Sequence, residues 1–273
     1  MKKIIIYNLI AFMALFTACK KESIKPIVTV PPDPYKHSHL IEIAYDNGIL
    51  IKYSYNTDNQ VAKVDYFNKS GAILNSRTFT YLNGKLVQVV FSNTTSTKNV
   101  TDYKYQGNTD LIESTITTAT DYQNSTNPVV TPTNSEEYSY LDGKIFKAIS
   151  KDSQNTPLSI RTSTYSVIGE NPFVTSVYTP QAVNGQSAKP EFNYKTEYYK
   201  DVLDPVFYFL GNSTSESKLL LKNVAYSASY GLTQAYELDD MGRIKTVTAV
   251  TLNSSTNPAM QTTVKATYTY ESY

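Results

Sequence analysis

The sequence predicts an all-β protein made of successive antiparallel hairpins. From residue 40 onward, short segments alternate apolar and polar residues, which is the pattern of strands with one buried face. Asn83-Gly84 and Asp142-Gly143 interrupt this alternation, and such pairs favour type I′ turns because both central positions need a positive φ. The 24 tyrosines also suit strands, since the ring packs while the hydroxyl stays hydrated. We therefore expect one antiparallel meander over residues 40–273, twisted and curved into a trough.

Residues 1–19 have the layout of a bacterial lipoprotein signal peptide. Lys2 and Lys3 give a positively charged start, and the apolar stretch after them is too short to span a membrane. Phe16-Thr17-Ala18-Cys19 then resembles a lipobox, in which the cysteine becomes the lipidated N-terminus. We expect a membrane anchor at Cys19 and an outer-membrane lipoprotein on the periplasmic or the cell-surface face. The alternative is an ordinary secretory signal followed by a free thiol.

Residues 20–39 are expected to form a tether, because their prolines favour an extended polyproline-like chain. His37 and His39, the only histidines of the chain, fall in this segment. Two histidines on a strand edge could ligate a metal, but no cysteine or acidic cluster accompanies them. We therefore expect no metal site and no cofactor. The formal net charge of +1 gives no basic excess that would indicate nucleic-acid binding.

The connections between the expected strands are of two kinds, tight turns and long loops rich in Ser, Thr and Asn. Because successive connections of a meander lie at opposite ends of the sheet, we expect the tight turns at one end and the polar loops at the other. Long loops often carry function, so the loop-rich end is a candidate interaction surface. The tight turns lie near 46–48, 57–59, 83–84, 106–109, 142–143 and 239–242. The long loops are 92–99, 118–136, 152–157, 182–190 and 253–258.

One apolar stretch, 201–211, breaks the strand pattern. Asp204 suits a helix N-cap, Pro205 suits the first helical position and Gly211 suits the exit. We expect a short helix or turn that packs its aromatic face on the sheet and fills the core. The alternative is a hydrophobic lip for a ligand, whose candidate binding residues are Phe207, Tyr208 and Phe209.

Catalytic groups are scarce in the expected domain. No histidine follows His39, so a Ser-His-Asp or Cys-His arrangement has no base there. Ser215-Glu216-Ser217-Lys218 has the spacing of some acyl-transfer enzymes, but it lies in a polar loop without companion motifs. Glu136-Glu137 and Asp239-Asp240 could serve glycoside hydrolysis, although neighbours on a strand point to opposite faces. We expect no enzyme, and a carboxylate-dependent glycoside hydrolase is the weaker alternative.

A turn motif recurs along the chain: an aromatic residue, then Asn or Asp with Gly, then a basic and an aliphatic residue. Copies run from Tyr81 to Leu86, from Tyr140 to Ile145 and, more loosely, from Tyr236 to Ile244. The motif resembles the YD (Rhs-type) repeat. Together with the lipobox, the chain resembles Rhs-repeat-like lipoproteins of unknown function in Bacteroidota. The resemblance implies hairpins and an envelope address, and no activity or site residues.

Tyr81 and Tyr140 have two interpretations. Aromatic pairs across strands stabilise sheets, so a tyrosine at a fixed repeat position is first a structural device. The second interpretation is a binding role, in which strand-end rings stack on a sugar or on a flat amphiphile.

These features predict a membrane-anchored, non-catalytic envelope lipoprotein that binds a ligand or partner through the trough or the long loops. A glycan, an amphiphilic small molecule and an envelope protein all stay open as partners. The alternative is a structural or assembly protein that pairs with a partner through a sheet edge. The candidate edges are the first and last strands, 41–45 and 263–270.

Overall fold

The computed structural model describes residues 33–93, 97–121, 129–168, 171–182, 187–210, 219–227, 230–253 and 260–273. Residues 34–273 form one compact unit. The predicted signal peptide with Cys19, the tether up to residue 32 and residues 215–218 lie outside the described residues, and so does the side chain of Phe207.

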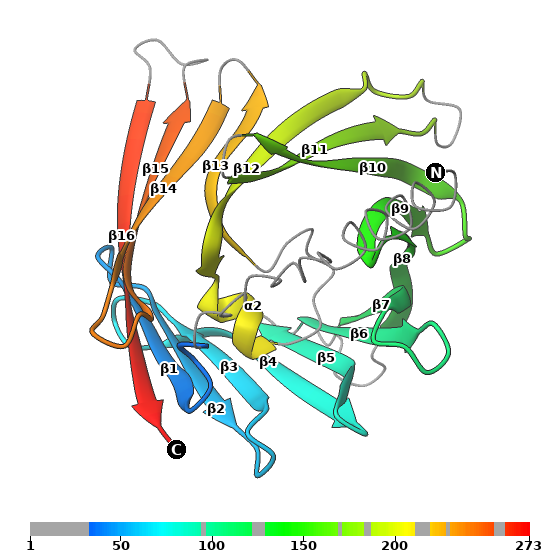
Figure 1. Ribbon diagram of the computed structural model, residues 1–273. Coiled ribbons are helices and arrows are strands. Elements are labelled where there is room, and N and C mark those ends of the chain that lie inside the picture. Colours follow the sequence, from blue (N-terminus) through cyan, green and yellow to red (C-terminus); the bar gives the residue numbers. More distant parts are fainter. Residues whose placement is uncertain are drawn as a thin grey trace, which may run out of the picture. The chain divides into compact units, whose positions relative to one another are not determined.

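Sixteen strands in the described part of the chain follow one another without a crossover and close into a barrel (Figure 1). Each strand pairs antiparallel with the next one along the chain, as the meander predicts. The strands are β1 (Ser38–Tyr45), β2 (Leu50–Tyr55), β3 (Val61–Phe67), β4 (Ile73–Leu82), β5 (Lys85–Asn93), β6 (Thr97–Tyr105), β7 (Ile112–Asp121), β8 (Val129–Leu141), β9 (Lys144–Asp152), β10 (Pro157–Ile168), β11 (Asn171–Pro180), β12 (Phe192–Leu203), β13 (Leu219–Ser227), β14 (Tyr230–Leu238), β15 (Ile244–Asn253) and β16 (Met260–Ser272).

The closure of the sheet corrects the expected open trough. In β1, Leu40 lies opposite Tyr270 of β16, and Ile43 lies opposite Tyr268. The all-β prediction is confirmed, but the open, curved sheet is wrong. The first and last strands pair with each other, so they are not the free edges that the assembly hypothesis needs.

A recurring β-bulge bends the sheet. Near the start of five odd-numbered strands, one residue has no partner on the preceding strand, and a bulge increases the local bend and twist. Each bulge follows a turn from an even to an odd strand, so all five lie at the same end of the barrel. A period-two pattern carries no sign of them, which is why the sequence predicted an open sheet. The unpaired residues are Ala62, Val87, Glu113, Phe146 and Lys245.

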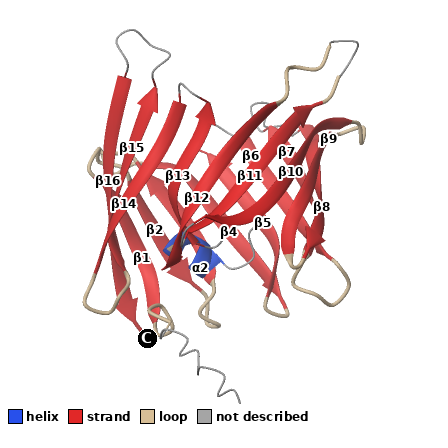
Figure 2. Ribbon diagram, turned by 45° about the horizontal axis from the view of Figure 1, so that its top comes forward, coloured by secondary structure: helices blue, strands red, loops and turns tan. Residues whose placement is uncertain are grey.

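One face of each strand points into the barrel. The helix α2 (Pro205–Leu210) lies inside the ring of strands near β1 to β4 (Figures 1 and 2). Its Val206, Phe209 and Leu210 pack against a buried cluster, which therefore marks the inner face. Residues opposite each other in an antiparallel pair share a face, so the register carries this inner face around the barrel. The cluster consists of Leu40, Ile43, Ile51, Tyr53, Val61, Val64, Phe79, Leu86 and Ala266.

The short helix predicted near 201–211 is confirmed as α2. Asp204 caps it, since its Oδ1 accepts a hydrogen bond of 2.8 Å from the Val206 amide. Tyr35, only 2% exposed, packs against α2 with its ring centroid 5.0 Å from that of Tyr208 and 5.7 Å from that of Phe209. Tyr35 comes from the segment that the sequence assigned to the tether, so the packed region includes part of that segment.

The predicted type I′ turns have the required backbone. Asn83 has a φ of 51° and Gly84 of 78°, while Asp142 has a φ of 51° and Gly143 of 74°. Both turns follow even-numbered strands, and connections of that kind share one end of the barrel. The turn at 46–49 follows β1 and lies at the opposite end, which corrects its expected place. The segments 92–99 and 118–136, which were expected to be long loops, are largely strand, so that expectation is wrong.

The outer face carries ion pairs. Glu42 precedes the inward Ile43, and its carboxylate lies 3.7 Å from the ammonium nitrogen of Lys52 on β2. Lys52 lies opposite Asp65 of β3, which pairs with Lys63 at 2.8 Å. Further pairs join Lys104 to Glu113, Lys151 to Glu137, Lys222 to Glu197 and Lys265 to Glu237.

No helix in the described ranges is long and apolar enough to cross a membrane.

Candidate functional site

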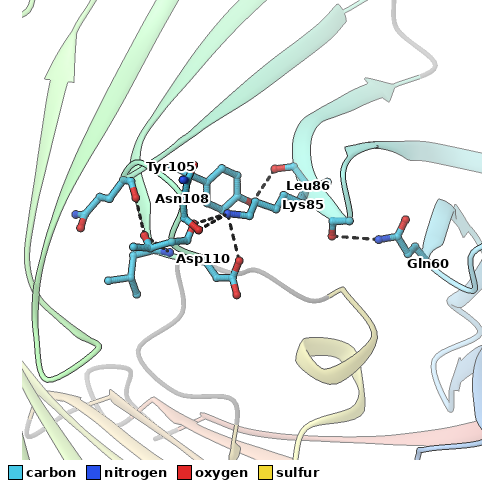
Figure 3. Close-up of polar contacts among 10 residues, drawn as sticks. Gln60, Lys85, Leu86, Tyr105, Asn108 and Asp110 are labelled. Carbon is cyan, nitrogen blue, oxygen red and sulfur yellow. Dashed lines mark hydrogen bonds and ion pairs between the residues drawn. The ribbon is translucent and has the colours of Figure 1, made fainter.

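The recurring tyrosine ties neighbouring hairpins together. The Tyr105 hydroxyl on β6 donates a hydrogen bond of 2.8 Å to the carbonyl oxygen of Leu86, at the start of β5 (Figure 3). Lys85, the preceding residue, holds its ammonium nitrogen 5.2 Å from the centroid of the Tyr105 ring, within the range of a cation–π contact. The basic and aliphatic residues of the motif therefore both meet the tyrosine of the next hairpin.

The same arrangement recurs at the other two copies of the motif. Tyr165 donates to the Ile145 carbonyl at 2.8 Å, and the Lys144 ammonium lies 5.1 Å from its ring centroid. Tyr270 donates to the Ile244 carbonyl at 2.9 Å. Arg243, which precedes Ile244, lies over the Tyr270 ring at 4.7 Å.

The first hairpin uses His39 in place of the basic residue. Tyr55 donates to the Leu40 carbonyl at 2.9 Å, and the His39 ring stacks on the Tyr55 ring at 3.8 Å. His39 also stacks on Tyr273 at 4.0 Å. In the described ranges, no group of three or more His, Cys, Asp or Glu side chains could hold a metal ion. The position of His39 is thus explained by the repeat.

Lys85, which follows the turn at 83–84, also contacts the neighbouring turn at 108–110 (Figure 3). Its ammonium donates to the carbonyl oxygens of Thr109 at 2.5 Å and of Asn108 at 3.3 Å, and lies 3.4 Å from an Asp110 carboxylate oxygen. The basic residue of the motif therefore has a structural role at this copy.

Tyr140 follows the structural interpretation as well. Its hydroxyl donates to the Ile112 carbonyl at 2.9 Å, and burial raises the pKa of the phenol despite this bond. Its hydroxyl is therefore engaged in the wall.

A polar cavity of about 230 Å³ opens on the inner wall across β6, β7 and β8. Register places most of its lining on the inner face: Thr115 lies opposite both Tyr103 and Glu136, and Thr117 lies opposite Thr101 and Asn134. The lining residues are Thr101, Tyr103, Thr115, Thr117, Asn134, Ser135, Glu136 and Tyr138.

The side chains of this cavity offer both donors and acceptors. The hydroxyl oxygens of Thr101 and Thr117 lie 3.0 Å apart, within hydrogen-bond distance. The Tyr138 hydroxyl donates to the Glu136 carboxylate. Glu136 is the only charged residue of the lining, and two tyrosine rings add apolar surface. Such a lining can hydrogen-bond a neutral ligand that carries several hydroxyls, and it disfavours an anion.

The structure brings together two of the candidate binding residues from the sequence. Tyr81 and Phe209 line a second, smaller cavity beside α2. Tyr208 contacts Phe209, with ring centroids 5.1 Å apart, and belongs to the packing of α2. Tyr140 lies elsewhere in the wall. Cys19 and the side chain of Phe207 lie outside the described residues.

The adjacent acids do not form a catalytic pair. Glu136 points inward, whereas Glu137 points outward and lies 2.5 Å from the Lys151 ammonium. Asp239 accepts hydrogen bonds from the Arg243 amide at 2.9 Å and from its guanidinium at 2.8 Å. Burial opposes ionisation of Asp239, but these bonds hold the pKa of the carboxyl below its ordinary value. Asp239 therefore acts as a turn-stabilising group.

The sequence analysis missed the threonines and Asn134 of the polar cavity. They stand at every second position of Thr-rich strands, and this alternation was the only sequence pattern that could have indicated them. Alternation alone does not say which face is inner, because that depends on the register and its bulges.

No protein-family model matches the chain, and none of the curated proteins matches it. A crystal structure of a porin-like protein from Bacteroides uniformis is similar, with a TM-score of 0.51 and 16% identity over 87% of this chain and 97% of that chain. A porin-like protein from Bacteroides vulgatus has a TM-score of 0.47 and 15% identity, over 85% of this chain and 98% of that one. The Photorhabdus luminescens Tc holotoxin pore has a TM-score of 0.30 and 12% identity, over 79% of this chain and 13% of that one. At such identities, the first likeness supports the barrel fold alone.

Proposed function

We propose that this protein is a non-catalytic binding protein of the cell envelope, anchored through a lipid on Cys19. In this proposal, it holds a small neutral ligand with several hydroxyls, such as a mono- or disaccharide, in the polar cavity across β6, β7 and β8. The observation that carries the proposal is the lining of that cavity by hydroxyls, one amide and one carboxylate together with two tyrosines.

The volume and chemistry of the cavity favour a sugar over the other open partners. About 230 Å³ leaves room for a ligand larger than benzene, for which about 150 Å³ suffices, and the lining is too polar for a lipid chain. The inner carboxylate of Glu136 accepts a bond from Tyr138 and keeps further lone pairs for a ligand hydroxyl.

The charged side chains on the outer face indicate that the barrel wall is exposed to water and not to lipid. A charged side chain on the lipid face of a membrane barrel costs about 2–4 kcal/mol near the midplane. Glu42, Lys52, Lys63 and Asp65 form a patch of charge across β1 to β3, where a lipid-facing wall would be apolar. A location in the cell envelope agrees with the porin-like description of the Bacteroides uniformis protein. In this proposal, the lipid on Cys19 and not the barrel wall anchors the protein to the membrane.

A pair of matched variants tests the ligand site. The full-length protein in detergent is titrated with a panel of neutral mono- and disaccharides by calorimetry. Glu136→Gln should weaken binding by about tenfold or more, because a charged hydrogen bond contributes roughly 1.5–3 kcal/mol. Glu137→Gln is the control, since its carboxylate lies on the outer face. Saccharide binding that is absent, or that falls equally in both variants, would overturn the proposal.

The anchor has a separate test. Cys19→Ala should release the protein from the membrane fraction, because the thiol that receives the lipid is gone. Unchanged membrane fractionation of that variant would show that no lipid holds the protein.

A further inference from the structure

A second cavity, of about 140 Å³, lies beside α2 and shares no lining residue with the polar cavity. The helix α2 supplies one wall through Phe209 and Leu210. The end of β4, the turns after β2 and β4, and the start of β5 supply the rest. The full lining is Asn59, Gln60, Tyr81, Gly84, Leu86, Phe209 and Leu210.

Tyr81 lacks the hydrogen bond that other tyrosines of the repeat donate to a backbone carbonyl. Among the described residues, its hydroxyl makes no hydrogen bond, although Tyr81 holds the same place before a bulge as Tyr105 and Tyr140. Burial of part of the side chain raises the pKa of the Tyr81 phenol to about 12, and Tyr81 lines the cavity. The tyrosines that donate to an aliphatic residue of the preceding odd strand are Tyr55, Tyr105, Tyr140, Tyr165 and Tyr270.

Hydrogen bonds and the turn conformation fix the two amide side chains of the cavity, Asn59 and Gln60. Gln60 donates from its side-chain nitrogen to the Gly84 carbonyl at 3.2 Å (Figure 3), and its side-chain oxygen accepts from Asn56 at 3.3 Å. Asn59 has a φ of 60°, which fixes the turn that carries it. Opposite these amides, Leu86 is 3% exposed and gives an apolar floor.

We propose that this cavity binds a small neutral molecule with one ring and one hydroxyl or amide group. The ring lies against Leu86, Phe209 and Leu210, and the polar group pairs with the Tyr81 hydroxyl. An apolar cavity of about 150 Å³ accommodates benzene, so about 140 Å³ limits the occupant to a single ring. The lining contains no charged residue, so a neutral ligand avoids the cost of burying a charge.

Phenol is the probe for this site. Ligand-observed NMR titration of the full-length protein should show saturable binding. Tyr81→Phe keeps the ring and removes the hydroxyl, so it should weaken phenol binding by about threefold to tenfold while leaving the melting temperature nearly unchanged. Leu210→Trp should fill the cavity and abolish the binding.

Tyr105→Phe is the matched control, because the Tyr105 hydroxyl is engaged in the wall. It should lower the melting temperature and leave phenol binding intact. Glu136→Gln should also leave phenol binding intact, which separates this site from the polar cavity. The inference is overturned if phenol does not saturate, or if Tyr81→Phe and Tyr105→Phe change its binding equally.

Discussion

Two regions of the inner wall are built from the same antiparallel pairing, but their inward side chains differ. The wall beside α2, formed by β1 to β5 and β16, carries aliphatic and aromatic residues that pack against the helix. The wall formed by β6 to β11 has a smaller apolar cluster around Ile112 and Ile145, and it also carries buried hydroxyls that pair, as in the 3.0 Å contact between Ser163 and Ser176. Strand geometry fixes which residues point inward, and α2 adds Val206, Phe209 and Leu210 to the apolar packing of its own wall.

The two walls should therefore depend on different interactions. Burial of apolar surface dominates beside α2, where Leu40 and Val61 are 0% exposed. In the polar wall each hydroxyl needs a partner, because a buried hydroxyl without one costs free energy.

The largest expected effect contrasts one residue from each wall. Ile43→Ala should lower the free energy of unfolding by about 2–5 kcal/mol, because it leaves a cavity in the cluster beside α2. Ser176→Ala should cost about 1 kcal/mol, the contribution of one hydrogen bond. Urea unfolding of both variants measures the difference, and equal costs would show that the two walls are not distinct.

The second-largest expected effect is a loss of stability at high pH in the region around α2, where Tyr35 is buried. Burial raises the pKa of Tyr35 from 10.0 to about 12, although a bond from the Ile244 amide partly opposes it. Because the folded pKa is the higher one, this stability is present below pH 10 and is lost as the pH rises towards 12. Two pKa units correspond to about 2.7 kcal/mol.

The measurement is the free energy of unfolding between pH 9 and pH 12, with phenolate absorbance as a second probe. Tyr35→Phe should make the pH dependence of stability less steep over this window, while the other buried tyrosines, such as Tyr55 and Tyr81, keep part of it. An unchanged slope would contradict the contribution assigned to Tyr35.

The hairpin turns should respond alike in both regions. Gly84→Val and Gly143→Val each place a β-branched residue at a positive φ, which should cost about 1–3 kcal/mol. An added Cβ meets no atom within 4 Å at either site, so the cost is backbone strain alone. Melting curves of the two variants check this, and a large inequality would show that the turns are not equivalent.

The smallest effect concerns the basic residue of the motif. Lys85→Met should cost about 0.5–1 kcal/mol through loss of the contact with Tyr105. Lys144→Met should cost less, if Lys85 gains from its bonds to the turn at 108–110. Thermal unfolding compares them, and a larger loss for Lys144→Met would reverse that ranking.

Tyr81 and Tyr140 show how far the repeat could be interpreted from the sequence. Both stand before an Asn-Gly or Asp-Gly turn, and the structural interpretation holds for Tyr140. For Tyr81 the tertiary structure differs, because it lines a cavity bounded by α2, which comes from residues more than a hundred positions away. No local pattern could have separated these two tyrosines.

The sequence by itself determined many local features: most of the strands, the type I′ turns and the capped helix α2. These depend on side-chain alternation, on φ at one or two positions and on one N-cap, all within a few residues. Only the tertiary structure decided the closure of the barrel and the contents of its inner wall. Closure requires β1 to meet β16 across the length of the domain, and it depends on bulges that bend the sheet without altering the period-two pattern.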